Sequence, residues 1–157
     1  MTDRCEECGA PGCEELFHRL LALDHSRAEP WGPLHGVSVA CFLLQHPSRL
    51  AVGGGARARA FLRAYLDGGL PAVNGLVGRA RAANSHRVRG RAPRPAAVAP
   101  GTGTETGTGA GAGAPRSGFA VTIAEVGQDR TFPAAGFPER VRAWAAATLE
   151  GWGPDSA

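Results

Sequence analysis

The sequence lacks lysine, a signal peptide and any long apolar run. All 17 of its basic residues are arginine, a bias that we attribute to a GC-rich genome, so an arginine at one position carries little information by itself. The chain begins Met-Thr-Asp-Arg-Cys-Glu-Glu, without the apolar stretch of a signal peptide. Its longest apolar run, Val37 to Leu44, is interrupted by Ser38 and is too short to cross a bilayer. We therefore expect a soluble, cytoplasmic protein without a membrane segment.

Cysteine is scarce as well, but three of the 4 cysteines lie close together near the start of the chain. In a reducing compartment, such residues are metal ligands or free thiols more often than disulfides. Cys5 and Cys8 form a C-x2-C pair followed by Gly9, which can adopt a positive φ and turn backbone N–H groups toward the thiolates. Cys13 lies at the expected start of a helix, where the dipole favours a thiolate. This arrangement predicts three ligands of a metal site.

The fourth ligand has to come from elsewhere in the chain, and His18, His35, Cys41 and His46 are the candidates. His35 and His46 would lie about 16 Å apart along one helix, so both cannot bind one ion. If the first two helices form an antiparallel hairpin, the end of the second lies beside the start of the first, which places His46 next to Cys13. His35 remains the alternate. Cys41 lies within an apolar segment, where we expect a buried, inert thiol.

Three thiolates and one imidazole make a closed tetrahedral zinc site, which is normally structural. We therefore expect zinc at Cys5, Cys8, Cys13 and His46, where it would contribute to folding. One alternative is that Cys5 and Cys8 form an exposed pair without a metal and that His46 caps a helix end. Another is a thioredoxin-type redox pair, but that pair follows a strand, and no strand can precede residue 5.

Apolar residues recur at helical spacing along most of the chain. The pattern predicts a mainly α, small α+β fold with four to five helices and a zinc-knuckle-like N-terminus. We expect helices at about 12–23, 35–46, 56–67, from Pro71 onward and 138–152. Gly68 and Gly69 end the third of these helices. Alternation of Phe119, Val121 and Ile123 with smaller residues predicts one half-buried strand or short hairpin.

Composition divides the chain into three parts: residues 1–85, 86–117 and 118–157. The middle part is mostly Gly, Ala, Thr and Pro after an Arg-rich start and cannot bury enough surface to fold, so we expect a disordered linker. The last part has to dock on the first, because one strand and one helix are not stable alone. Residues 79–117 carry a net charge of +6 but no aromatic residue to stack on bases, so we expect no nucleic-acid binding.

Several of these motifs together resemble a bacterial family catalogued as domain of unknown function 5946. The match is specific over residues 5–47 and looser over 119–152. Where family members tend to have Val-Asp-x-Tyr, this chain has residues 39–42 as Val-Ala-Cys-Phe, so no role for an acid or phenol is implied there. The residues that carry the resemblance are Cys5, Cys8-Gly9-Ala10, Cys13, Leu20-Leu21, His35, Gln45-His46-Pro47, Trp144-Ala145 and Trp152.

Because that family is uncharacterised, the resemblance implies a set of residues but no reaction. Our first hypothesis is a non-catalytic interaction or regulatory module with a structural zinc site and an unidentified protein partner. The second is a metal-dependent enzyme, or a metal or thiol sensor, in which His35 or His46 lines an open site. Coordination separates the two, since four protein ligands favour the first and three ligands plus water favour the second.

Overall fold

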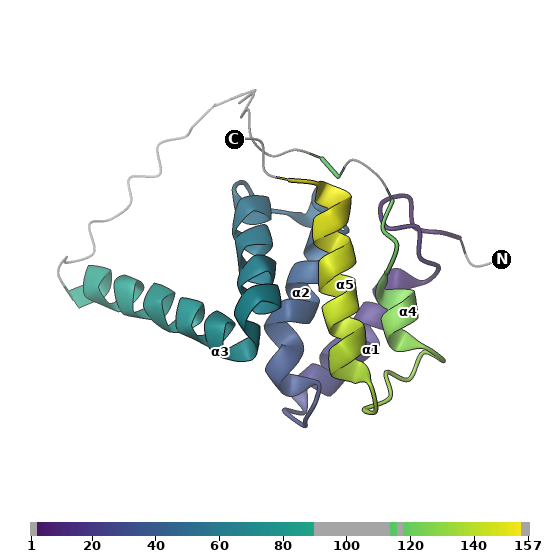
Figure 1. The fold of residues 1–157 in the computed structure, drawn as a ribbon, viewed down its shortest axis with the longest axis horizontal. Coiled ribbons are helices and arrows are strands. Elements are labelled where there is room, and N and C mark those ends of the chain that lie inside the picture. The colour runs from purple at the N-terminus through teal and green to yellow at the C-terminus, as the bar shows by residue number, and fades with distance from the viewer. Residues whose placement is uncertain (1–2, 90–113, 116–117, 155–157) are drawn as a thin grey trace.

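The computed structural model in Figure 1 describes residues 3–89, 114–115 and 118–154. Within these ranges the chain is helical and has no β-strand, and one isolated antiparallel bridge pairs Arg4 with Pro11. The prediction of a mainly helical fold is confirmed. The elements in chain order are α1 (Cys13–His25), η1 (Gly32–Leu34), α2 (His35–Leu44), η2 (Pro47–Arg49), α3 (Gly54–Arg89), α4 (Ile123–Gly127) and α5 (Phe137–Trp152).

Helix α2 is the centre of the bundle. It packs against α1, α3 and α5, and Figure 1 shows it between α5 and the first half of α3. Its sequence is apolar nearly all round, which is typical of a helix with neighbours on most sides. Helix α1 instead buries one face, through Leu16 and Leu20, as its amphipathic pattern predicts. The side chains that α2 buries are Val37, Ser38, Ala40, Cys41, Phe42 and Leu44.

Helix α3 is interrupted at Gly69, whose φ of 67° and ψ of −161° are not helical. The predicted end of a helix at Gly68-Gly69 is therefore a sharp break, and Pro71 lies in the first turn beyond it. Figure 1 shows the second half of α3 projecting away from the bundle. In this half Val73 is buried, but every side chain from Val77 to Ser85 is exposed. We call residues 70–89 the projecting arm.

Helix α5 packs against α2 and α3, as expected for the bulky stripe in its sequence. Its Trp144 is fully buried, and the indole Nε1 of Trp152 donates a hydrogen bond of 2.8 Å to the carbonyl oxygen of Leu44. Gln45 makes a second tie, because its Nε2 donates to Thr148 Oγ1 at 2.9 Å and to the carbonyl of Val121 at 2.8 Å. The end of α2 is thus attached to the C-terminal part of the chain.

The strand predicted around residues 119–125 is not formed. The segment reaches Thr122 without regular structure and then enters α4 at Ile123. Thr122 and Glu125 form a capping box: Thr122 Oγ1 accepts from the N–H of Ala124, while the Glu125 carboxylate accepts from the N–H of Thr122. This cap starts a helix at the point where the apolar alternation favoured a strand.

The predicted linker, residues 86–117, falls mainly on positions 90–113 and 116–117, which lie outside the described residues. Helix α3 continues to Arg89, past the point where its apolar pattern ends. No helix in the described ranges has both the length and the apolar composition needed to cross a membrane.

Thr122→Ala tests the cap of α4. The substitution removes the hydroxyl that accepts from Ala124 and leaves the Glu125 carboxylate with one hydrogen bond fewer, so we expect the free energy of unfolding to fall by about 1–2 kcal/mol. Urea denaturation of the metal-loaded protein measures the change. Thr131→Ala is the matched control, because Thr131 is exposed and should change stability little. Equal effects of the two substitutions would contradict the role of the cap.

Candidate metal centre

The loop between Cys5 and Ala10 is folded back on itself. Gly9, with a φ of 77°, donates its N–H to the carbonyl of Cys5 at 2.9 Å, and the N–H of Cys5 donates to the carbonyl of Ala10 at 3.1 Å. The N–H of Ala10 points at Cys8 Sγ, 3.4 Å away. Backbone donors of this kind stabilise thiolates. Gly9 has the positive φ that its sequence context predicts, and the loop that it shapes can stabilise the Cys8 thiolate.

The other two residues of the site come from helix ends. Cys13 is the first residue of α1, which follows Gly12 with a φ of 61°, and His46 follows the end of α2. Cys13 Sγ and His46 Nε2 are 3.3 Å apart. The structure therefore brings the start of α1 and the end of α2 together, as the antiparallel hairpin predicts.

The ligand atoms of Cys5, Cys8, Cys13 and His46 all lie within 4.8 Å of one another. A tetrahedral site with Zn–S bonds of about 2.3 Å and a Zn–N bond of about 2.0 Å separates its ligand atoms by about 3.5–3.8 Å. The four atoms need to move by little more than an ångström at most to reach that geometry, so this group could hold one metal ion. We call these four residues the Cys3His cluster.

The imidazole of His46 is held in the orientation that a ligand requires. Its Nδ1 lies 2.7 Å from the carbonyl oxygen of Phe42, which can only accept, so Nδ1 carries the proton and Nε2 presents its lone pair to the cluster. The ring also stacks on Phe42 with 4.0 Å between centroids, and Phe42 stacks on Phe17 at 3.8 Å. Burial lowers the pKa of His46 even though the bond to Phe42 opposes this shift, which favours the neutral, metal-binding ring.

The three thiols differ in their ionisation. Burial raises the pKa of Cys8 to about 12, with a smaller contribution from repulsion by the other two thiolates, and burial also raises the pKa of Cys13. Burial alone would raise the pKa of Cys5 as well, but hydrogen bonds from the N–H groups of Cys8 and Glu7 lower it overall. Three thiolates in this volume repel one another, so a divalent cation would stabilise all of them.

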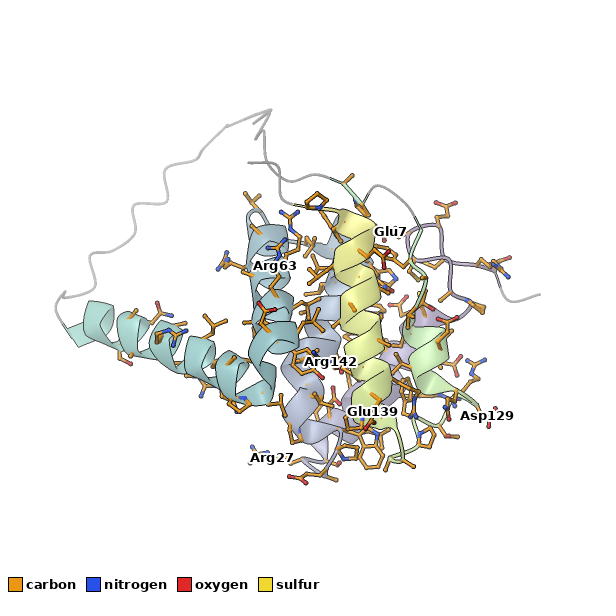
Figure 2. All side chains as sticks on the ribbon, viewed as in Figure 1. Glu7, Arg27, Arg63, Asp129, Glu139 and Arg142 are labelled. Atoms are coloured by element: carbon orange, nitrogen blue, oxygen red, sulfur yellow. The ribbon has the colours of Figure 1, made fainter. Side chains whose placement is uncertain are left out.

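Glu7, which the sequence-based interpretation did not single out, fastens the loop to the chain beyond His46. Its carboxylate accepts a hydrogen bond from the N–H of Ser48 and another from Ser48 Oγ, both 2.9 Å long. Glu7 is labelled in Figure 2. Nothing in the local pattern of Cys-Glu-Glu-Cys indicates that the second acid reaches a residue 41 positions away.

The other candidate ligands lie apart from the Cys3His cluster. His35 begins α2, at the opposite end from His46, and its Nδ1 is 3.0 Å from the Asp24 carboxylate. Burial raises the pKa of Asp24 although His35 opposes this shift. Cys41 is completely buried, and burial raises the pKa of its thiol. His18 is exposed on α1.

A cavity of about 400 Å³ lies between residues 4–11 and 118–125. Of the Cys3His cluster only Cys8 contributes to its wall, and Cys8, Cys13 and His46 are buried while Cys5 is half-buried. Most of the cluster is therefore buried, and its four donor atoms could hold an ion.

A family model described as a family of unknown function, DUF5946, matches residues 3–153. No curated protein and no solved structure matches the chain. The family model spans the Cys3His cluster and the α-helices of the described residues, α1 to α5.

We expect His46 of the metal-free, reduced protein to titrate below the usual histidine pKa of about 6.5 and to carry its proton on Nδ1. Because the folded pKa is the lower one, the neutral ring stabilises the fold above about pH 6.5, and this contribution is lost as the pH falls below that value. Long-range proton–nitrogen NMR correlations report both properties. A midpoint at or above the usual value, or a proton on Nε2, would contradict the orientation derived above.

Proposed function

The chain belongs to the DUF5946 family, and because the function of that family is unknown, we propose one from the site: a zinc-stabilised, non-catalytic interaction or regulatory module. In this proposal one zinc ion is bound by Cys5, Cys8, Cys13 and His46. The observation that carries it is the gathering of four protein donors, three sulfurs and one imidazole nitrogen, within 4.8 Å of one another. Four protein ligands complete a tetrahedron and leave no position for water or substrate.

Zinc is the metal that this set of donors favours. Thiolate sulfur is a soft ligand that selects zinc, copper(I) or iron–sulfur clusters, and a tetrahedral mixture of sulfur and imidazole is typical of zinc. A hydrogen bond from the other ring nitrogen, such as the one from His46 to Phe42, is a common accompaniment of such ligands.

The role of the ion is to join three pieces of chain. The loop of residues 5–10 contains no helix or strand, and zinc would tie it to the start of α1 and to the end of α2. Because a preformed site does not exist in the unfolded chain, the free energy of metal binding becomes free energy of folding. For a bundle of this size that contribution is large.

The projecting arm supports the interaction role. It leaves the bundle at Gly69, and its side chains from Val77 to Ser85, including Arg79 and Arg81, are exposed. Side chains that stay exposed on a helix add little to its stability, so a partner that binds residues 77–85 would stabilise the outer part of the arm. The partner we propose is a protein.

The second candidate is a metal-dependent enzyme or a metal or thiol sensor with an open site. Its support is weaker, because a fourth donor, His46, is already present and His35 is paired with Asp24 instead. An open site would require His46 to be displaced from its hydrogen bond to Phe42.

Zinc binding is tested by native mass spectrometry of the purified chain and its variants. We expect one zinc ion per wild-type chain, no retained zinc in Cys8→Ser, and an affinity loss of more than about a hundredfold in His46→Ala, since a ligand matters more than the partners around it. His35→Ala is the matched control and should retain zinc. A wild type that takes up no zinc even when zinc is added would sink the proposal, and loss of metal in His35→Ala alone would reverse the choice of ligand.

Coordination is tested with cobalt(II) in place of zinc. A closed site with three sulfurs and one nitrogen should give an intense visible spectrum that added azide does not change. A spectrum that shifts on addition of azide would favour the open site of the second candidate, because azide can bind only at a position that the protein leaves free.

The partner is tested by photo-crosslinking in living cells. A photoreactive residue at Ala82, exposed on the arm, should give one defined covalent adduct with another protein, whereas the same residue at Ala146, exposed on α5, should not. Identical adducts from the two positions, or none from Ala82, would argue against the arm as the interaction surface.

A further inference from the structure

A cleft of about 410 Å³ opens where α3 breaks, at the opposite end of α2 from the Cys3His cluster. Its size falls within the range of small-molecule sites. The wall is formed by the loop before α2, by the break in α3 and by the first turns of α5. The apolar side chains on this wall are Pro30, Pro33, Leu34, Leu70 and Pro138.

Arg142 supplies a positive charge at this cleft. It projects from α5 on the side that faces α3, as Figure 2 shows, and its Nη2 donates a hydrogen bond of 2.7 Å to the carbonyl oxygen of Leu66, just before the break. This bond holds the guanidinium in place. Its Nε and Nη1 have no hydrogen-bond partner in the part of the chain that the structure describes.

Tyr65 supplies a hydroxyl. Its side chain is only 6% exposed and lines the cleft, and the hydroxyl makes no hydrogen bond with residues 3–89, 114–115 or 118–154. Burial raises the pKa of this phenol, although Arg142 opposes the shift, so the hydroxyl keeps its proton and can donate it to an acceptor. The hydroxyl is not one of the fully buried side-chain atoms that lack a partner, so water in the cleft can reach it, and an oxygen atom of a ligand could take the place of that water.

We propose that this cleft binds a small monocarboxylate with an apolar body. The carboxylate would accept hydrogen bonds from the free N–H groups of Arg142 and from the Tyr65 hydroxyl, and the hydrocarbon part would lie against the prolines and leucines of the wall. This site is separate from the Cys3His cluster and uses none of its residues.

The charges around the cleft favour a single negative charge on the ligand. Among the described residues that line the cleft, Arg142 is the one cationic side chain, whereas Glu29 also lines it and Glu139 lies close enough to affect Tyr65 electrostatically. A dianion such as phosphate would be repelled by these carboxylates more strongly than a monoanion, whose single charge is matched by that of Arg142. An amide or alcohol of the same shape would leave the guanidinium without a charged partner.

The test is titration of the zinc-loaded, full-length protein with benzoate, phenylacetate and hexanoate, followed by proton–nitrogen NMR. We expect saturable shifts in the millimolar range or below for at least one carboxylate, confined to the backbone around residues 30–34, 65–70 and 138–142. Benzamide, hexanamide and inorganic phosphate should bind at least about tenfold more weakly, because a hydrogen bond to a charged group is worth more than one to a neutral group.

Two conservative variants test the polar contacts. Tyr65→Phe removes only the hydroxyl and should weaken carboxylate binding about tenfold, and Arg142→Gln should weaken it more. Arg57→Gln, at an exposed position earlier on α3, is the control and should bind as the wild type does. Wild-type affinity in both cleft variants, equal binding of amides or phosphate, or no saturable shift with any of the three carboxylates would overturn the proposal. The zinc content of each variant is measured in parallel, so that a loss of carboxylate binding can be told apart from a loss of zinc.

Discussion

The last turn of α2 is the constraint on which the rest of the structure depends. Helix ends leave carbonyl groups without intrahelical partners, and in a buried position each of them needs a donor. Here the carbonyl of Phe42 accepts from the His46 ring and that of Leu44 accepts from the indole of Trp152. Gln45, between the two, reaches Thr148 and the segment before α4. One helix end therefore organises both the candidate metal centre and the docking of α5.

This shared origin links the metal centre to the fold. The hydrogen bond that completes α2 also sets the tautomer of His46, so the geometry that satisfies a buried carbonyl is the geometry that presents Nε2 to three thiols. Phe17 of α1 stacks on Phe42, and Phe42 stacks on His46. These ring contacts join α1 to the end of α2. A change that shifts the end of α2 is thus expected to disturb both the Cys3His cluster and the hydrogen bond from Trp152 to Leu44.

Sequence patterns predicted the parts of this structure that depend on local periodicity. The helical spacing of Leu16 and Leu20 agrees with the structure, and His46 lies beside Cys13, where an antiparallel hairpin would place it. The prediction of a strand was wrong. It relied on the alternation of Phe119 and Val121 with smaller residues and did not take account of the capping box at Thr122, which starts a helix. The Glu7–Ser48 contact could not be predicted, because it depends on the tertiary approach of two segments far apart in sequence.

Gly69 shows how one residue shapes a region remote from the metal centre. A Cβ atom placed there would meet only Pro71 Cδ, at an ordinary distance of 3.7 Å, so space does not require glycine. The backbone does, because φ and ψ of 67° and −161° are strained for any residue with a side chain. That conformation ends the first half of α3 beside Tyr65 and turns the arm outward. The cleft and the arm therefore share a cause at Gly69, which is the conformation of its backbone.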